Sequence, residues 1–364
     1  MISQIHRYML VQTLFGLAIA AATISGVILL VDFVEQSRNI DSRLDVSAFD
    51  LASLTLLKAP SLIESTLQFI FLFGVLMALF RLNRRSEIVV MRGSGISAWR
   101  ILTAPMILSI VVGLLGAMAL NPLAAAGIQS ANRLQDVLMN VQRIPGTDDQ
   151  VWLREANIDG YTIIEARTLR RDEQVVEDVT FLYFNQAEDG VPSLLRRINA
   201  PIAYLRDGYW EVEAAVERLP ESAATQLGQV RLPTSIDRQV LFEQARSPEG
   251  VSFWLLPSLI DRAERAGLAS ENYQLRWHSL LALPLTLLAS TLIAAAATMR
   301  LHRLGGATTF ALAGGLGGFV MFFLQELLGS IGSAGALPPI TAAWAAPALT
   351  ALLALIYIAS TEDG

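Results

Sequence analysis

Six long apolar runs set the pattern of this chain, and polar stretches separate them. The runs cover approximately residues 9–31, 60–80, 101–120, 279–298, 307–328 and 340–359. Each is close to the roughly 20 residues that a helix needs to cross the hydrocarbon core of a bilayer. Residues 121–278 contain no run of this length. The pattern therefore predicts an α-helical polytopic membrane protein with six transmembrane helices, three on each side of a folded insert.

The insert has the signals of strands over most of its length. Residues 161–166 and 179–184 are rich in β-branched and aromatic side chains, which favour strands. The dipeptide Asp207-Gly208 separates two further such runs, and it accepts the positive φ angles of a tight hairpin turn. In the second arm, starting at Trp210, apolar residues alternate with glutamates. Several short strands at this spacing predict an all-β domain of the sandwich or jelly-roll kind.

The chain is therefore expected to have three parts. They are residues 1–123 with helices one to three, residues 124–275 with the β domain and its flanking helical connectors, and residues 276–364 with helices four to six.

Basic residues in the short loops predict the orientation of the chain in the membrane. The loop at 81–100 holds five arginines and one acid, and the loop at 299–306 holds two arginines. The turn at 329–339 holds no arginine or lysine. Because cytoplasmic loops carry the excess of basic charge, both termini are expected in the cytoplasm. The central domain and the segment 32–58 are then on the outer face, which is the periplasm of a bacterium that has one.

Composition agrees with a membrane protein and excludes other classes. Hydrophobic residues make up 53% of the chain and charged residues 16%, well below the quarter that is usual in soluble domains. The mean hydropathy is +0.47. A formal net charge of −6 gives no general basic excess, so nucleic acid is not an expected partner.

No catalytic constellation is recognisable in the sequence. There is no G-x-x-x-x-G-K-[ST] run for nucleotide phosphates, and the single lysine, Lys58, lies on the predicted outer side. The three histidines, His6, His278 and His302, lack the spacing of metal ligands, and there is no cysteine. We therefore expect a non-catalytic chain that binds no metal or cofactor.

Two features together resemble a known family. They are the order of three spans, an outer β domain and three spans, and the motif SEIVVMRGSGIS at 86–97 in the first cytoplasmic loop. Both are similar to the LptF/LptG permeases of the ABC transporter that exports lipopolysaccharide. The segments at 33–36 (FVEQ) and 335–339 (GALPP) are most like the LptG branch.

The resemblance implies a set of partners and a mechanism. A permease of this kind pairs with an LptF-type permease and with a cytosolic ABC ATPase dimer, on which ATP and Mg²⁺ are bound. It extracts lipopolysaccharide from the bacterial inner membrane. The β domain, a jelly roll in the family, passes the lipid to periplasmic LptC/LptA-type jelly-roll proteins that bridge to the outer membrane.

The loop at 81–100 is the candidate site for contact with the ATPase. A short amphipathic helix is expected over 86–91, ended by Gly93 and Gly95, with Ser97 as the N-cap of the next span. The resemblance implies that Glu87 pairs with a basic residue of the ATPase and that the neighbouring apolar side chains fill a groove. The candidate coupling residues are Ser86, Glu87, Ile88, Val89, Val90, Met91 and Arg92. The alternative is an ordinary basic loop whose arginines only set the orientation.

Three arginines are candidates for binding the phosphates of lipid A, because a guanidinium group can hold a phosphate with two hydrogen bonds. They are Arg38, Arg43 and Arg276. The alternative is that Arg38 and Arg43 are interfacial charges paired with nearby acids.

Small residues indicate where helices approach closely. Gly314 and Gly318 form a G-x-x-x-G pattern in the fifth span. By resemblance, they belong to a lateral gate between the two permeases, whereas the alternative is static packing inside one chain. Likewise, the strands at 161–166 and 179–184 line either a slot for acyl chains or an ordinary core.

Two other functions remain open at this stage. One is an ABC permease for another lipid or for lipoproteins, although such permeases usually have four spans and a large domain after the first. The other is a six-span membrane anchor for a periplasmic β domain that acts in sensing or assembly.

Overall fold

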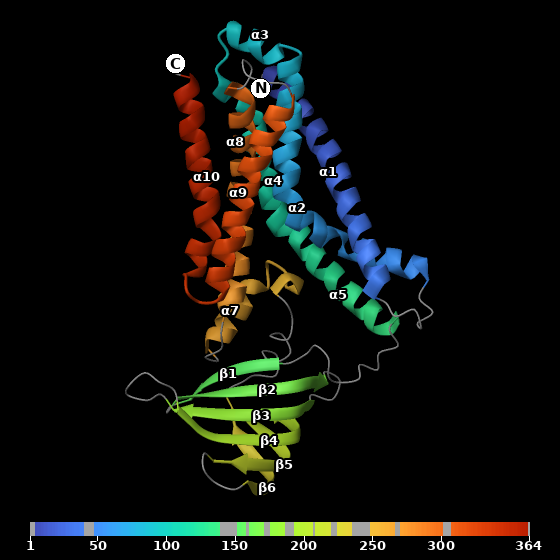
Figure 1. Cartoon of the computed structure of the whole chain (residues 1–364), viewed down its shortest axis with the longest axis vertical. Coiled ribbons are helices and arrows are strands. Elements are labelled where there is room, and N and C mark those ends of the chain that lie inside the picture. Colours follow the sequence, from blue (N-terminus) through green and yellow to red (C-terminus); the bar gives the residue numbers. More distant parts are fainter. Residues whose placement is uncertain are drawn as a thin grey trace. The chain divides into compact units, whose positions relative to one another are not determined.

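The computed structural model describes residues 4–39, 47–138, 151–157, 160–170, 175–185, 193–206, 208–219, 224–234, 248–265, 270–300 and 307–362. The chain divides into two compact units (Figure 1). The membrane unit comprises Met1–Leu138, Ser252–Trp254 and Gln274–Gly364, and the β unit comprises Met139–Val251 and Leu255–Tyr273. The helical connector up to Leu138 therefore belongs with the membrane helices.

Six helices of the described residues are long and apolar enough to cross a membrane, as the hydrophobic pattern predicts. The helices of this unit are α1 (Gln4–Asn39), α2 (Ala48–Arg84), α3 (Glu87–Gly93), α4 (Ala98–Leu115), the π-helical turn η1 (Gly116–Leu120), α5 (Asn121–Leu138), α8 (Glu271–Arg300), α9 (Ala307–Ser333) and α10 (Pro339–Glu362). The third span runs without a break from α4 through η1 into α5.

Two helices extend well beyond their apolar runs. The segment 32–58 was expected to be a polar connection, but α1 continues to Asn39 and α2 already begins at Ala48. A capping box explains the early start of α2. The Ser47 hydroxyl accepts a hydrogen bond from the backbone N–H of Asp50, whose carboxylate accepts from the backbone N–H of Ser47.

The core of the membrane unit is built from aliphatic side chains and small residues. Buried residues of α2 and α8 form most of one cluster, to which α1, α3, α4, α9 and α10 contribute. Helices α1 and α2 come closest at Gly16 and Gly74, since a Cβ atom on Gly16 would lie 2.3 Å from the Gly74 carbonyl oxygen. In a membrane, where lipid tails are as apolar as leucine, such close approach supplies the packing energy between helices.

The described part of the β unit contains an antiparallel six-stranded sheet. Its strands follow one another in sequence order, as Figure 1 shows. The strands are β1 (Val151–Asn157), β2 (Gly160–Arg170), β3 (Val175–Asn185), β4 (Ser193–Arg206), β5 (Tyr209–Arg218) and β6 (Thr225–Pro233). The predicted hairpin is present, with Arg206 opposite Tyr209 and a positive φ of 84° at Gly208. Asp207 lies outside the described residues.

One face of the sheet carries a hydrophobic core. Phe181 and Trp210 meet edge to face with ring centroids 5.9 Å apart, and Ala263 of α7 (Leu256–Arg265) belongs to the same cluster. The expected inserted all-β domain is therefore confirmed. Its described strands form a meander, and the second sheet of a jelly roll is not seen among them.

Candidate functional site

The loop between the second and third spans folds into a short helix held between two sharp turns. Ser86 has a φ of 57°, in the left-handed region, so the chain reverses direction directly before α3. Gly95 has a φ of 85° and ends the helix, with the Ile96 N–H donating to the Met91 carbonyl. Ser97 caps α4 as predicted, because its hydroxyl accepts a hydrogen bond from the Arg100 N–H. The helix begins one residue later and ends two residues later than the sequence suggested, and Gly93 is its last residue.

The side chains of α3 face two ways. Ile88 is only 7% exposed and joins the core of the membrane unit, and Met91 packs partly against the same core. Val89 and Val90 are 48% and 69% exposed. Of the apolar residues expected to enter a partner's groove, Ile88 is thus engaged inside its own chain. The apolar surface left for a partner is the pair Val89 and Val90, with exposed Arg92 beside it.

Glu87 is held in place by a residue from the first helix. The Tyr8 hydroxyl donates a hydrogen bond of 2.5 Å to one carboxylate oxygen of Glu87, and Arg85 approaches the other at 3.9 Å. The side chain of Glu87 keeps 29% of its surface exposed. A carboxylate has about four acceptor positions, so these contacts leave room for a further donor. Sequence analysis missed Tyr8, because nothing in the sequence places residues 79 positions apart side by side.

The C-terminal end of α2, where the loop begins, also contacts neighbouring helices. The guanidinium of Arg81 lies over the Phe15 ring of α1, with its central carbon 4.5 Å from the ring centroid. The Asn83 amide donates to the Thr298 carbonyl of α8 at 3.4 Å. The base of the loop therefore contacts α1 and α8, the first and fourth spans.

The three candidate phosphate-binding arginines are in different situations. Arg38 is exposed in the last turn of α1, and Arg43 lies outside the described residues. Arg276 of α8 forms an ion pair with Glu64 of α2, and this carboxylate is itself buried. The Asn121 amide donates to both Glu64 oxygens, at 3.2 and 3.4 Å. Arg276 is thus part of an internal polar cluster, and Arg38 is the outward-facing arginine.

The glycine pattern of α9 packs against α2 of the same chain. A Cβ atom on Gly314 would lie 2.2 Å from Leu76, and one on Gly318 would lie 2.1 Å from Leu72. These contacts match the alternative of packing inside one chain. The opposite side of α9 is apolar and exposed, as at Leu316.

Strands at 161–166 and 179–184 were candidates for an acyl-chain slot. Their core-facing side chains, including Ile164, Val179 and Phe181, are almost fully buried against one another and against Trp210. At one margin of this core, burial raises the pKa of the Tyr183 hydroxyl, and the nearby Arg196 guanidinium offsets part of that rise. In the described part of the β unit, these side chains fill the interior.

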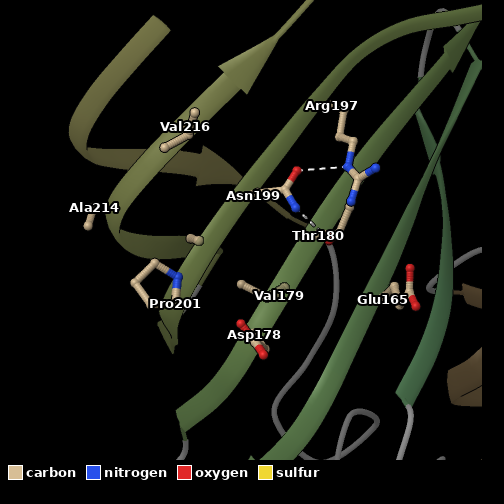
Figure 2. Close-up of a pocket in the computed structure, with 10 residues that line it drawn as sticks. Glu165, Asp178, Val179, Thr180, Arg197, Asn199, Pro201, Ala214 and Val216 are labelled. Carbon is tan, nitrogen blue, oxygen red and sulfur yellow. Dashed lines mark hydrogen bonds between the residues drawn. The ribbon is translucent and has the colours of Figure 1, made fainter. Parts of the chain in front are cut away.

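A cavity of about 430 Å³ lies on the opposite face of the sheet (Figure 2). A row of neighbouring positions on β2 to β5 lines it: Glu165, Thr180, Asn199 and Val216. Asn199 donates to the Thr180 hydroxyl at 3.2 Å and accepts from Arg197 at 2.7 Å. Two of its other lining residues, Asp178 and Ala214, have positive φ angles of 52° and 50°. Ala214 lies at a register shift between β5 and β6. This surface is polar. The sequence alone does not reveal it, because the register between the strands decides which side chains become neighbours.

The described residues include no group of three or more histidine, aspartate or glutamate side chains able to hold a metal ion. What the described loop offers is a short helix with an exposed valine pair and a positioned carboxylate.

Comparison with models of protein families gives a match over nearly the whole chain. The model of the family described as "Lipopolysaccharide export system permease LptF/LptG" matches residues 7–360. A search of individual curated proteins found no match.

Proposed function

The chain belongs to the LptF/LptG family of lipopolysaccharide export permeases, and we propose that it uses ATP hydrolysis on partner subunits to extract lipopolysaccharide from the bacterial inner membrane. The observation that carries the proposal is the docking helix α3. It projects two valines and a positioned carboxylate from a loop rich in arginine. The sequence itself has no phosphate-binding motif for a nucleotide, so the energy has to come from a partner.

The apolar pair is expected to supply more of the docking energy than the carboxylate. Fully burying a valine side chain stabilises a complex by about 1.5–3 kcal/mol, and an exposed ion pair by only about 0–1 kcal/mol. Val89 and Val90 would therefore provide affinity, and Glu87 would provide orientation and selectivity for a basic residue on a cytosolic ABC ATPase. Ser86 and Met91 support this surface from its two ends.

Arg38 is the arginine best placed to bind the lipid. It lies in the last turn of α1, a helix that is exposed along much of its length, and within the described residues it has no ion pair or hydrogen bond. A lipid A phosphate could accept two hydrogen bonds from its guanidinium. Arg276 would have to leave Glu64 before it could do the same, and a buried carboxylate without a partner is costly.

The exposed apolar sides of α1 and α9 are the surfaces proposed to meet the paired LptF-type permease and to open toward the lipid. Large side chains such as Phe15, Leu30, Leu316 and Phe319 lie there. The β unit would take the lipid from the membrane unit and pass it to LptC/LptA-type proteins in the periplasm. Both termini and α3 would lie in the cytoplasm, and the distribution of arginine in the loops supports this orientation.

Purification of the tagged chain from its bacterial membrane tests this proposal. The expected result is recovery of an ABC ATPase, a second six-span permease and bound lipopolysaccharide, with ATPase activity that rises when lipopolysaccharide is added. Recovery of the ATPase with a different lipid or a lipoprotein would support a permease for another cargo. Recovery of the chain without an ATPase would contradict the proposal and favour a membrane anchor for the β unit.

A further inference from the structure

The third span contains a backbone carbonyl that lacks its usual α-helical donor. Pro122 has no N–H, so the carbonyl of Met118, four residues earlier, lacks its usual helical donor. The indole N–H of Trp254 donates to this carbonyl at 3.1 Å. The side chain of Trp254 therefore occupies a place that the sequence Asn121-Pro122 leaves open.

Asn121, the residue before this proline, uses both ends of its amide. It is fully buried, and its oxygen accepts a hydrogen bond of 2.7 Å from the Phe253 backbone N–H. Its nitrogen donates to both oxygens of Glu64 on α2, and Glu64 pairs with Arg276 on α8. The orientation of the amide is fixed by these partners, since the reverse orientation would place like groups against one another.

The residues held by this cluster, Ser252–Trp254, have an unusual position in the chain. They belong to the membrane unit, whereas the residues before them (Met139–Val251) and after them (Leu255–Tyr273) belong to the β unit. The chain therefore returns to the membrane unit for three residues between two segments of the β unit.

We propose that Asn121 is a positioning residue that clamps the strap Ser252–Trp254, so that movements of α2 and α8 are passed to the β unit. This inference rests on the proposed transport function, in which the membrane helices move and the β unit receives the lipid. The clamp stays closed through the cycle, and Arg276 serves it by holding the Glu64 carboxylate.

Exchange of the two polar groups tests the clamp. Asn121→Asp places two carboxylates together, and Glu64→Gln removes the charge that Arg276 binds. The double variant Asn121→Asp/Glu64→Gln restores a pair of one amide donor and one carboxylate, with the two groups exchanged between positions 121 and 64. Trp254→Phe removes the N–H that reaches Met118 together with part of the ring system, and it keeps a smaller aromatic ring next to Phe253.

The assay uses the full complex in proteoliposomes, with lipopolysaccharide as substrate and a periplasmic jelly-roll acceptor. In Asn121→Asp, we expect transfer to the acceptor to fall about tenfold, as for loss of a hydrogen bond to a charged group. Basal ATPase activity without lipopolysaccharide stays at the wild-type level, and the double variant recovers most of the transfer. In Trp254→Phe, transfer falls less, with basal activity again unchanged.

The outcomes separate this inference from the proposed function. Wild-type complex without lipopolysaccharide transfer would overturn the proposed function. Normal wild-type transfer, with Asn121→Asp or Trp254→Phe as active as wild type, would overturn the clamp alone, as would failure of the double variant to recover. If Asn121→Asp fails to assemble, Trp254→Phe decides, and unchanged transfer in that variant also overturns the clamp.

Discussion

Two glutamates of this chain, Glu64 and Glu87, carry the same carboxylate in opposite surroundings. The side chain of Glu64 is 6% exposed and is bound by Arg276 and Asn121, which come from elements distant in the sequence. Glu87 is held by a single hydroxyl from Tyr8 and keeps an exposed edge. Arg84, the last residue of α2, lies 20 positions after Glu64, which is roughly 30 Å along the helix. The comparison teaches that a carboxylate surrounded by its own chain serves assembly, whereas one held at the surface is available to a partner.

The largest effect is expected at the closed cluster. Glu64→Leu removes the carboxylate and leaves Arg276 charged and without its partner, which should lower the stability of the membrane unit by about 3–5 kcal/mol. Thermal unfolding in detergent measures this loss. Glu87→Leu is the matched control, and it should unfold close to the wild-type temperature because its carboxylate is at the surface. Equal losses in the two variants would remove the distinction between the two glutamates.

The arginines extend the comparison to the lipid. Arg38→Glu should raise the lipopolysaccharide concentration needed to stimulate ATPase activity by about tenfold or more, because a charge-assisted contact contributes about 1.5–3 kcal/mol. Basal activity should not change. Arg38→Lys is the control, since it keeps the charge without the planar fork and should have an intermediate effect. An unchanged concentration dependence in Arg38→Glu would show that Arg38 is only an interfacial charge.

Val90→Asp tests whether the exposed valine pair contributes to docking. Burial of the exposed Val90 side chain should contribute about 1–2 kcal/mol to the binding free energy. Association with the ATPase should therefore weaken about tenfold in this variant. Titration of the ATPase onto the reconstituted permease pair measures it. Ser94→Asp adds the same charge to an exposed position just after α3 and controls for electrostatics. Similar weakening in both variants would attribute the effect to charge and not to apolar contact.

Tyr8→Phe should give the smallest effect, since it removes one hydrogen bond to an exposed carboxylate. The lost hydrogen bond should cost about 1 kcal/mol of the energy that holds Glu87 in its orientation. The expected result is a few-fold drop in lipopolysaccharide-stimulated ATPase activity. Thr13→Val is the control on the same helix, because the Thr13 hydroxyl bonds only to Met9 within α1. If both variants behave as wild type, Tyr8 does not position Glu87.

Local signals in the sequence predicted a good part of this structure. Ser97 as a cap and the hairpin at Gly208 depend on neighbouring residues alone, so short-range chemistry is enough. The six spans follow from the length of apolar runs.

Features that depend on distant contacts were not predictable. The inward position of Ile88 requires knowledge of how α3 packs on the core. The pairing of Arg276 with Glu64 joins residues 212 positions apart. Without knowledge of this pairing, Arg276 was a candidate for binding phosphate. Pro122 predicts that the Met118 carbonyl lacks its α-helical donor. Nothing near Pro122 in the sequence predicts that Trp254 donates to this carbonyl.

The central claim is that this chain receives the energy of ATP hydrolysis at α3. The most direct test compares wild-type and Glu87→Arg chains, both inserted in the membrane, for association with the ATPase and for lipopolysaccharide-stimulated activity. Reversal of the charge should place two cations together at the docking surface, so the account predicts normal insertion with loss of association and of stimulation. Wild-type association and stimulation in Glu87→Arg would contradict it.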